Sequence, residues 1–194
     1  MVLQAILPVV IYWVTAIIAD FDKPPIDIYV LKPVLLNQCA QMALAFAFPI
    51  GTGVASDADL WKLPVALVLL DLLFFLVHAC FHAFQFLYRF HRMHHELAPS
   101  SMRGGEALYT TLVDHVFVNL VPLALAAHLA QLSYTATIVF YCFAAHNTVV
   151  VHFDTNSFHA EHHRHPCRNL GLCGLLTDRL RLAQLTHTGK LFYR

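Results

Sequence analysis

The chain has 194 residues, of which 58% are hydrophobic and only 12% are charged, and its formal net charge at pH 7 is zero. Soluble domains carry about 25% charged residues, so the composition is atypical of a soluble domain and favours an integral membrane protein. A net charge of zero gives no indication of a nucleic-acid partner. The sequence shows neither internal repeats nor a low-complexity linker, and we expect a single domain over residues 1–194.

Five apolar segments are close to the length of about 20 residues that crosses a hydrocarbon core. In chain order they are residues 2–19, 34–50, 63–81, 116–132 and 135–151, and they predict an all-α membrane protein. The segment 34–50 is weakened by three polar residues, so the sequence is compatible with four or five spans. The last two segments predict a helical hairpin. The first lacks a basic leader and a small-residue cleavage site, which favours a retained helix over a signal peptide.

The basic residues predict an orientation. Nine of the twelve Lys and Arg residues lie in segments 82–115 and 152–194, which by the positive-inside rule face the cytoplasm. If residues 34–50 span the membrane, the N-terminus lies on the opposite side; if they are re-entrant, it is cytoplasmic. The cysteines show no paired spacing, and we interpret them as packing residues with reduced thiols: Cys39, Cys80, Cys142, Cys167 and Cys173.

Eight of the 14 histidines form three compact boxes at the predicted cytoplasmic helix ends. Residues three or four apart share one helix face, so each box directs its imidazoles to one side. Neutral imidazole is a ligand of iron, zinc and copper, and eight imidazoles exceed the needs of one four-coordinate zinc. We therefore predict two metal ions in one site, with these candidate ligands: His78 and His82; His91, His94 and His95; His159, His162 and His163.

Metal-bound imidazoles usually donate their second N–H group to a carboxylate or a carbonyl. Asp71 precedes His78 by seven residues and shares its helix face, whereas Glu96 adjoins the second box and Glu161 lies within the third. We expect these three carboxylates to support the ligands. Four histidines are not expected to bind metal: His115, which we interpret as an interfacial partner of Asp114; His128, near the far-side turn; His165, at the surface; and His187, in the tail.

The boxes resemble those of the fatty acid hydroxylase / sterol desaturase superfamily. Residues 71–82, DLLFFLVHACFH, are similar to its first box, and residues 87–95, LYRFHRMHH, followed by Pro99, are similar to its second. Residues 159–163, HAEHH, with Asn169-Leu170-Gly171 and the sequence TDRL at 177–180, resemble its third box and the continuation. The resemblance covers about residues 65–185 and departs at Leu170 and Thr177, where the family usually carries aromatic residues.

The resemblance implies a di-iron oxygenase of the endoplasmic reticulum or another internal membrane. Such enzymes use dioxygen and two electrons, commonly from cytochrome b5 and its reductase, to hydroxylate or desaturate a C–H bond of a sterol, sphingoid base or fatty acyl lipid. The implied cofactors are two iron ions, with zinc as a substitute on overexpression.

Family members add histidines between the second and third boxes, for which His146 and His152 are the candidates. Aromatic residues of the third segment and of the stretch directly after it are candidates for the wall of a lipid tunnel: Phe74, Phe75, Phe81, Phe84 and Phe86. Two alternatives stay open: a carotenoid hydroxylase, and an inactive or zinc-binding membrane protein of the same fold.

Overall fold

The computed structural model describes residues 2–51, 53–98, 102–166 and 170–171. Over these residues the regular secondary structure is all helical, with no strand, which confirms the predicted all-α class. The long helices are α1 (Val2–Ala19), α2 (Ile28–Ala47), α3 (Asp59–Ala83), α7 (Tyr134–Phe153) and the continuous run of α5 (Leu112–Asp114), η3 (His115–Leu120) and α6 (Val121–Leu129). Short elements connect them: α4 (Gln85–His91), η1 (Arg92–Glu96), η2 (Gly104–Glu106) and α8 (Phe158–Arg164).

Five helical segments in the described part of the chain are long and apolar enough to cross a membrane, and the second of them is α2. This helix begins before the predicted segment 34–50 because Asp27 caps its N-terminus and accepts a hydrogen bond from Tyr29 N. Its full length favours the five-span alternative. Large apolar side chains are exposed along the helices, among them Ile17, Val65 and Leu76. Such a surface suits contact with lipid rather than water, and the chain is an integral membrane protein.

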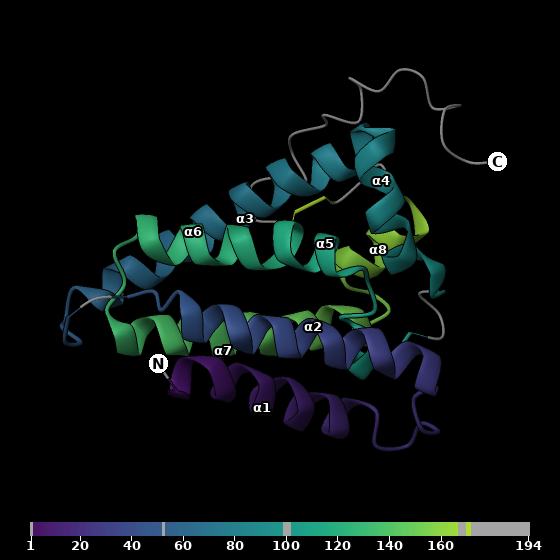
Figure 1. The fold of residues 1–194 in the computed structure, drawn as a ribbon, viewed down its shortest axis with the longest axis horizontal. Helices are drawn as coiled ribbons and strands as arrows, with labels where there is room; N and C mark the ends of the chain where they lie inside the picture. Colours follow the sequence, from purple (N-terminus) through teal and green to yellow (C-terminus); the bar gives the residue numbers. More distant parts are fainter. Residues whose placement is uncertain (1, 52, 99–101, 167–169, 172–194) are drawn as a thin grey trace.

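The helices form two packed sets that run along the same direction (Figure 1). In one set, α1 packs along α7 and beside α2, and Trp13 Nε1 donates a hydrogen bond of 2.7 Å to Gln38 Oε1. In the other, α3 packs against α6, where Ala66, Ala126 and Ala127 are fully buried. Small residues at this interface allow the two helix backbones to approach closely.

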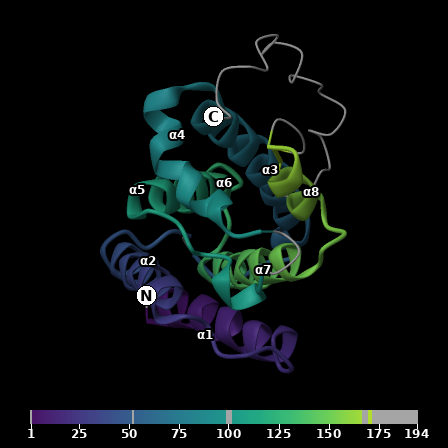
Figure 2. The ribbon, with the colours of Figure 1, turned by 90° about the vertical axis from the view of Figure 1, so that its right-hand side faces the viewer.

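The short elements α4 and α8 lie together at one end of the bundle, opposite the N-terminus (Figures 1 and 2). Residue 2 and the histidine boxes therefore lie at opposite ends, as the five-span alternative requires. The run from Leu112 to Leu129 begins at the box end and contains a π-helical stretch at His115–Leu120. Such wide turns are frequent at functional sites.

Residues 102–110 are held between α1, α2 and α7 at the box end. The Asp20 carboxylate accepts hydrogen bonds from Gly104 N at 3.1 Å and Gly105 N at 2.8 Å. Asn37 Nδ2 donates to the carbonyls of Leu108 and Thr110, both at 3.0 Å. Polar residues that weaken α2 as a membrane helix thus fix the segment that leads to Asp114.

Candidate metal centre

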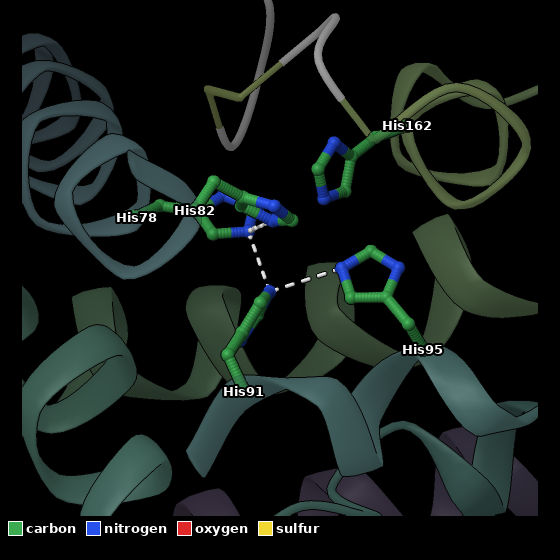
Figure 3. Close-up of side chains that lie close together, drawn as sticks. All are labelled: His78, His82, His91, His95 and His162. Atoms are coloured by element: carbon green, nitrogen blue, oxygen red, sulfur yellow. Dashed lines mark hydrogen bonds between the residues drawn. The ribbon is translucent and has the colours of Figure 1, made fainter. Parts of the chain in front are cut away.

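Nine of the histidines that the structure describes converge from α3, α4, η1, α7 and α8 into two adjacent groups. In each group, one ring nitrogen of every histidine lies within 4.8 Å of those of the others. The five-histidine group consists of His78, His82, His91, His95 and His162. The four-histidine group consists of His94, His152, His159 and His163. Figure 3 shows that the five imidazoles approach a common point from α3, from the α4–η1 segment and from α8.

Local backbone geometry divides each HxxHH box between the two groups. The helix α4 ends at His91 and continues as the 3₁₀ helix η1, and His91 and His95 share the five-histidine group while His94 enters the other. In α8 the pair at positions i and i+4, His159 and His163, joins the four-histidine group, and His162 faces the opposite one. Each of these two boxes therefore contributes two imidazoles to one group and one imidazole to the other group, so both boxes link the two groups.

The Nε2 atoms of each group lie unusually close to one another. In the five-histidine group the separations are 3.0 Å for His78–His91, 3.0 Å for His91–His95 and 3.2 Å for His78–His82. In the four-histidine group they are 3.1 Å for His94–His159, 3.2 Å for His94–His163, 3.1 Å for His159–His163 and 3.4 Å for His94–His152.

Hydrogen bonds at Nδ1 set the tautomer of three of these rings. His78 Nδ1–H donates to Leu170 O at 2.9 Å, and His91 Nδ1–H donates to Asp114 Oδ1 at 2.8 Å. His152 Nδ1–H donates to Thr148 O at 2.6 Å. A neutral imidazole protonated at Nδ1 carries a lone pair at Nε2. Two such lone pairs, on His78 and His91, face each other at 3.0 Å, an arrangement that repels unless a cation lies between them.

The separations fit ligands of a shared metal ion. Two nitrogens that each lie about 2.1 Å from one ion are about 3.0 Å apart at a right angle and about 3.4 Å apart at the tetrahedral angle. The Nε2 separations of both groups fall within this range. The donor set is all imidazole, which suits iron, zinc or copper. Each group can therefore hold one metal ion.

Burial keeps four imidazoles of η1 and α8 neutral. Loss of hydration lowers the pKa of His94, His159 and His163 well below the usual value, and neighbouring imidazoles lower it further. The same causes lower the pKa of His95 to about 2. Desolvation disfavours the imidazolium form, so these rings offer free lone pairs at neutral pH without the loss of a proton.

Asp114 is a functional residue that the sequence reasoning missed. Its buried carboxylate accepts hydrogen bonds from His91 Nδ1–H at 2.8 Å and from Thr110 Oγ1 at 2.5 Å. The Thr111 side chain caps the helix by accepting from Asp114 N. The available signal was a carboxylate at a capped helix start that follows the second box by a short segment.

Two of the three carboxylates predicted to support ligands have other partners. Asp71 is fully buried in α3, and the Nδ1–H of His78 donates to Leu170 O. Glu96 accepts a hydrogen bond from Tyr109 Oη at 3.1 Å, and Glu161 forms an ion pair with Arg164 at 3.0 Å. Proximity in sequence to a box therefore did not identify the carboxylate beside a ligand.

His152 joins the four-histidine group, whereas His146 lies in neither group. The helix α7 is continuous across both residues, and the six-residue separation turns His146 to another face, where its Nδ1 lies 3.1 Å from Thr15 Oγ1 of α1. The prediction of His146 as a ligand is thus not supported. A bend after Phe153 and the Ser157 cap of α8 redirect the chain so that His152 meets His159.

The remaining histidines also have definite positions. His128 and His165 are exposed and lie outside both groups, as predicted. His115 is 1% exposed and faces the bundle interior directly after Asp114. Cys39 and Cys80 are exposed rather than packed. Several predicted features lie outside the described residues: Cys167, Asn169, Cys173, the segment TDRL at 177–180 and His187.

Two cavities lie beneath the histidines. A small one, of about 20 Å³, is lined by histidines of both groups together with Phe74 and Asp114. A larger one, of about 160 Å³, extends between the membrane helices and is lined mainly by apolar side chains. The site therefore joins a polar, metal-binding end to an apolar interior.

A comparison with protein families agrees with this geometry. A family model described as fatty acid hydroxylase matches residues 63–181, which is more than half of the chain and contains all nine grouped histidines and Asp114. No curated protein and no solved structure matches the chain. The chain belongs to the fatty acid hydroxylase family.

Proposed function

We propose that this protein is a membrane di-iron oxygenase that uses dioxygen and two electrons to hydroxylate or desaturate a C–H bond of a sterol, sphingoid or fatty acyl lipid. One observation carries the proposal: nine imidazoles form two adjacent groups around a small cavity, which shares lining residues with an apolar cavity within the membrane helices. Membership of the family supports lipid hydroxylase or desaturase activity.

The residues divide the work between metal binding and ligand orientation. The five-histidine group would hold one iron ion and the four-histidine group the other. Bound iron would supply the activation of dioxygen, which amino-acid side chains lack. Five imidazoles exceed the four ligands of a closed tetrahedral zinc site, which favours an ion with more coordination positions. Asp114 keeps the His91 ring oriented and holds its proton on Nδ1, so that Nε2 carries the lone pair.

The fold also controls access to the site. Phe74, Asn119 and Thr148 line both cavities, so a lipid in the larger cavity would reach the histidines past these side chains. The apolar walls exclude water from the reacting carbon and hold the lipid in place. The buried positions of His78, His91 and His162 keep bulk water from the ligands as well.

Electrons would arrive at the exposed face of the histidine end. Arg89 and Arg92 are exposed on α4 and η1, and their positive charge suits an acidic donor such as cytochrome b5 with its reductase. The positive-inside rule places the same face toward the cytoplasm. We propose the endoplasmic reticulum as the membrane.

Oxygen consumption by iron-loaded protein in lipid nanodiscs tests the proposal. With a reductant and a panel of sterols, sphingoid bases, fatty acyl lipids and carotenoids, we expect consumption that depends on one lipid class and incorporation of labelled oxygen or a new double bond. The His94→Ala variant should be inactive, and the His128→Ala variant should match the parent because His128 lies outside both groups. Iron-loaded protein that consumes no more oxygen with any lipid than His94→Ala would contradict an oxygenase and indicate a metal-binding protein.

A further inference from the structure

The larger cavity lies among α1, α2, α3, α7 and the run from η3 to α6. Most of its wall is apolar, with Leu70, Phe74 and Leu123 among the lining residues. Its volume of about 160 Å³ resembles that of a protein cavity of about 150 Å³ that accepts benzene. It can therefore enclose a ring or a short run of methylenes, with the rest of a lipid extending out of it.

This cavity continues toward the metal centre. Phe74, Asn119 and Thr148 line it and also line the small cavity beside His78, His91 and His152. On α7 its wall extends from Thr148 to Tyr141, a length of about 10 Å at 1.5 Å per residue. An occupant of the larger cavity is therefore in line with the grouped histidines.

The wall also contains polar groups that lack partners within the described residues. Gln38 Oε1 accepts a hydrogen bond from Trp13 Nε1, and its Nε2 donor has no partner there. The Asn119 amide lies 3.5 Å from His115 Nδ1, which leaves the proton on Nε2, and that donor is likewise unpaired. The side chain of Gln38 is 3% exposed and that of His115 is 1% exposed.

A complementary acceptor lies at the other end of the cavity. Gln4 Nε2 donates to Ile50 O at 3.1 Å, and Gln4 Oε1 has no partner among the residues described. Gln4 is 1% exposed. Buried polar groups in native proteins are nearly always hydrogen-bonded, and an unpaired one costs stability. Three such groups along one cavity indicate that its occupant supplies their partners.

We infer that this cavity binds an oxygen-bearing part of the lipid substrate, whose hydroxyl or carbonyl oxygen accepts hydrogen bonds from His115 Nε2 and Gln38 Nε2. A hydroxyl group at the far end would in turn donate to Gln4 Oε1. The inference rests on the proposed function and narrows it, because an unoxygenated hydrocarbon leaves all three groups unpaired. His115 and Gln38 thereby determine substrate specificity.

Trp13 provides a reporter for lipid binding that does not depend on activity. The chain has two tryptophans, and the Trp61→Phe substitution leaves Trp13, which contacts Gln38, as the fluorophore. Bromine quenches tryptophan fluorescence at short range. The probes are 2-bromododecan-1-ol (bromododecanol), whose bromine is on the carbon next to the hydroxyl, and 2-bromododecane (bromododecane), which lacks the hydroxyl. We expect bromododecanol to quench at a concentration about tenfold lower than bromododecane in the full-length Trp61→Phe protein.

Substitutions of similar volume test which residues cause the preference. The double variant His115→Phe/Gln38→Met removes both donors, and its preference for the alcohol should fall to about one. The matched control is Asn147→Leu, since Asn147 Nδ2 is also unpaired in the described part of the chain but the residue does not line the cavity. This control should keep the tenfold preference.

Three results would overturn the inference: equal quenching by the two probes, no quenching by either, or a preference that persists in the double variant. The proposed function is judged separately by oxygen consumption. Protein that prefers the alcohol but oxidises no lipid retains the binding site and loses the oxygenase proposal. Protein that oxidises a lipid but shows no preference for the alcohol supports the oxygenase proposal and contradicts the binding site.

Discussion

Replacement of Asp114 by Asn, a side chain of the same shape, tests whether the carboxylate supports His91 as a metal ligand. The carboxylate accepts from His91 Nδ1–H at 2.8 Å and from Thr110 Oγ1 at 2.5 Å. An amide can accept from His91 Nδ1–H and donate to the Thr110 hydroxyl, which also accepts hydrogen bonds. The substitution therefore keeps both contacts and removes only the negative charge beside the His91 ring. Loss of a group that supports a metal-bound histidine typically weakens metal binding 10- to 100-fold, or about 1.4–2.7 kcal/mol.

The assay is a titration of the detergent-purified, metal-free protein with Fe²⁺ or Zn²⁺ against a competing chelator at neutral pH. We expect weaker binding at the five-histidine group in Asp114→Asn and unchanged helix content by circular dichroism. The control is Glu96→Gln, because Glu96 adjoins the second box in sequence but contacts Tyr109. Unchanged affinity in a folded Asp114→Asn protein, or an equal loss in Glu96→Gln, would refute the reasoning.

Three further outcomes are expected. His163→Ala should remove the metal ion of the four-histidine group while His146→Ala leaves metal content unchanged, as elemental analysis can check. The metal-free protein should lose thermal stability as pH falls below about 6.5, because the unfolded chain then binds more protons than the folded one. The loss should be about 1.4 kcal/mol per pH unit for each imidazole whose pKa is lowered by burial, such as His95. A melting temperature that is constant or rises between pH 7.5 and 5.5 would contradict this. Gly104→Ala should destabilise the fold by about 1–3 kcal/mol in chemical unfolding, because its Cβ would lie 2.5 Å from Val149 Cγ1, and a neutral effect would show that the segment is loosely packed.

The histidine boxes were predictable because their spacing is local. Positions i and i+4 meet on one helix turn whatever the rest of the fold does, so His78 with His82 and His159 with His163 follow from the sequence. The division of His94 and His95 between two groups does not, because it depends on the change from α4 to the 3₁₀ helix η1 and on the position of α8.

Contacts between distant segments could not be read from the sequence. Asp114 reaches His91 across 23 positions, whereas Glu96 and Glu161, which adjoin boxes, turn to Tyr109 and Arg164. A carboxylate that supports a ligand is chosen by tertiary packing, and the helices that bring it there are fixed by apolar burial rather than by local spacing.

The polar residues of α2 also have roles that could not be predicted from the sequence. In the sequence, Asn37 and Gln38 weaken a membrane span, and a re-entrant segment was an equal alternative. In the structure both are buried: Asn37 fixes the segment before Asp114, and Gln38 bonds Trp13 at the cavity wall. Hydropathy alone penalises such residues, although a bundle interior can bury them and give them a role.

Metal stoichiometry after iron-replete expression tests the central claim most directly. Elemental analysis with Mössbauer spectroscopy should find about two irons per chain with a coupled signal. His82→Ala, from the five-histidine group, and His94→Ala, from the four-histidine group, should each reduce the count to about one and abolish the coupling. A single zinc, no metal, or two irons that both variants retain would contradict a centre of two metal ions divided between these histidines.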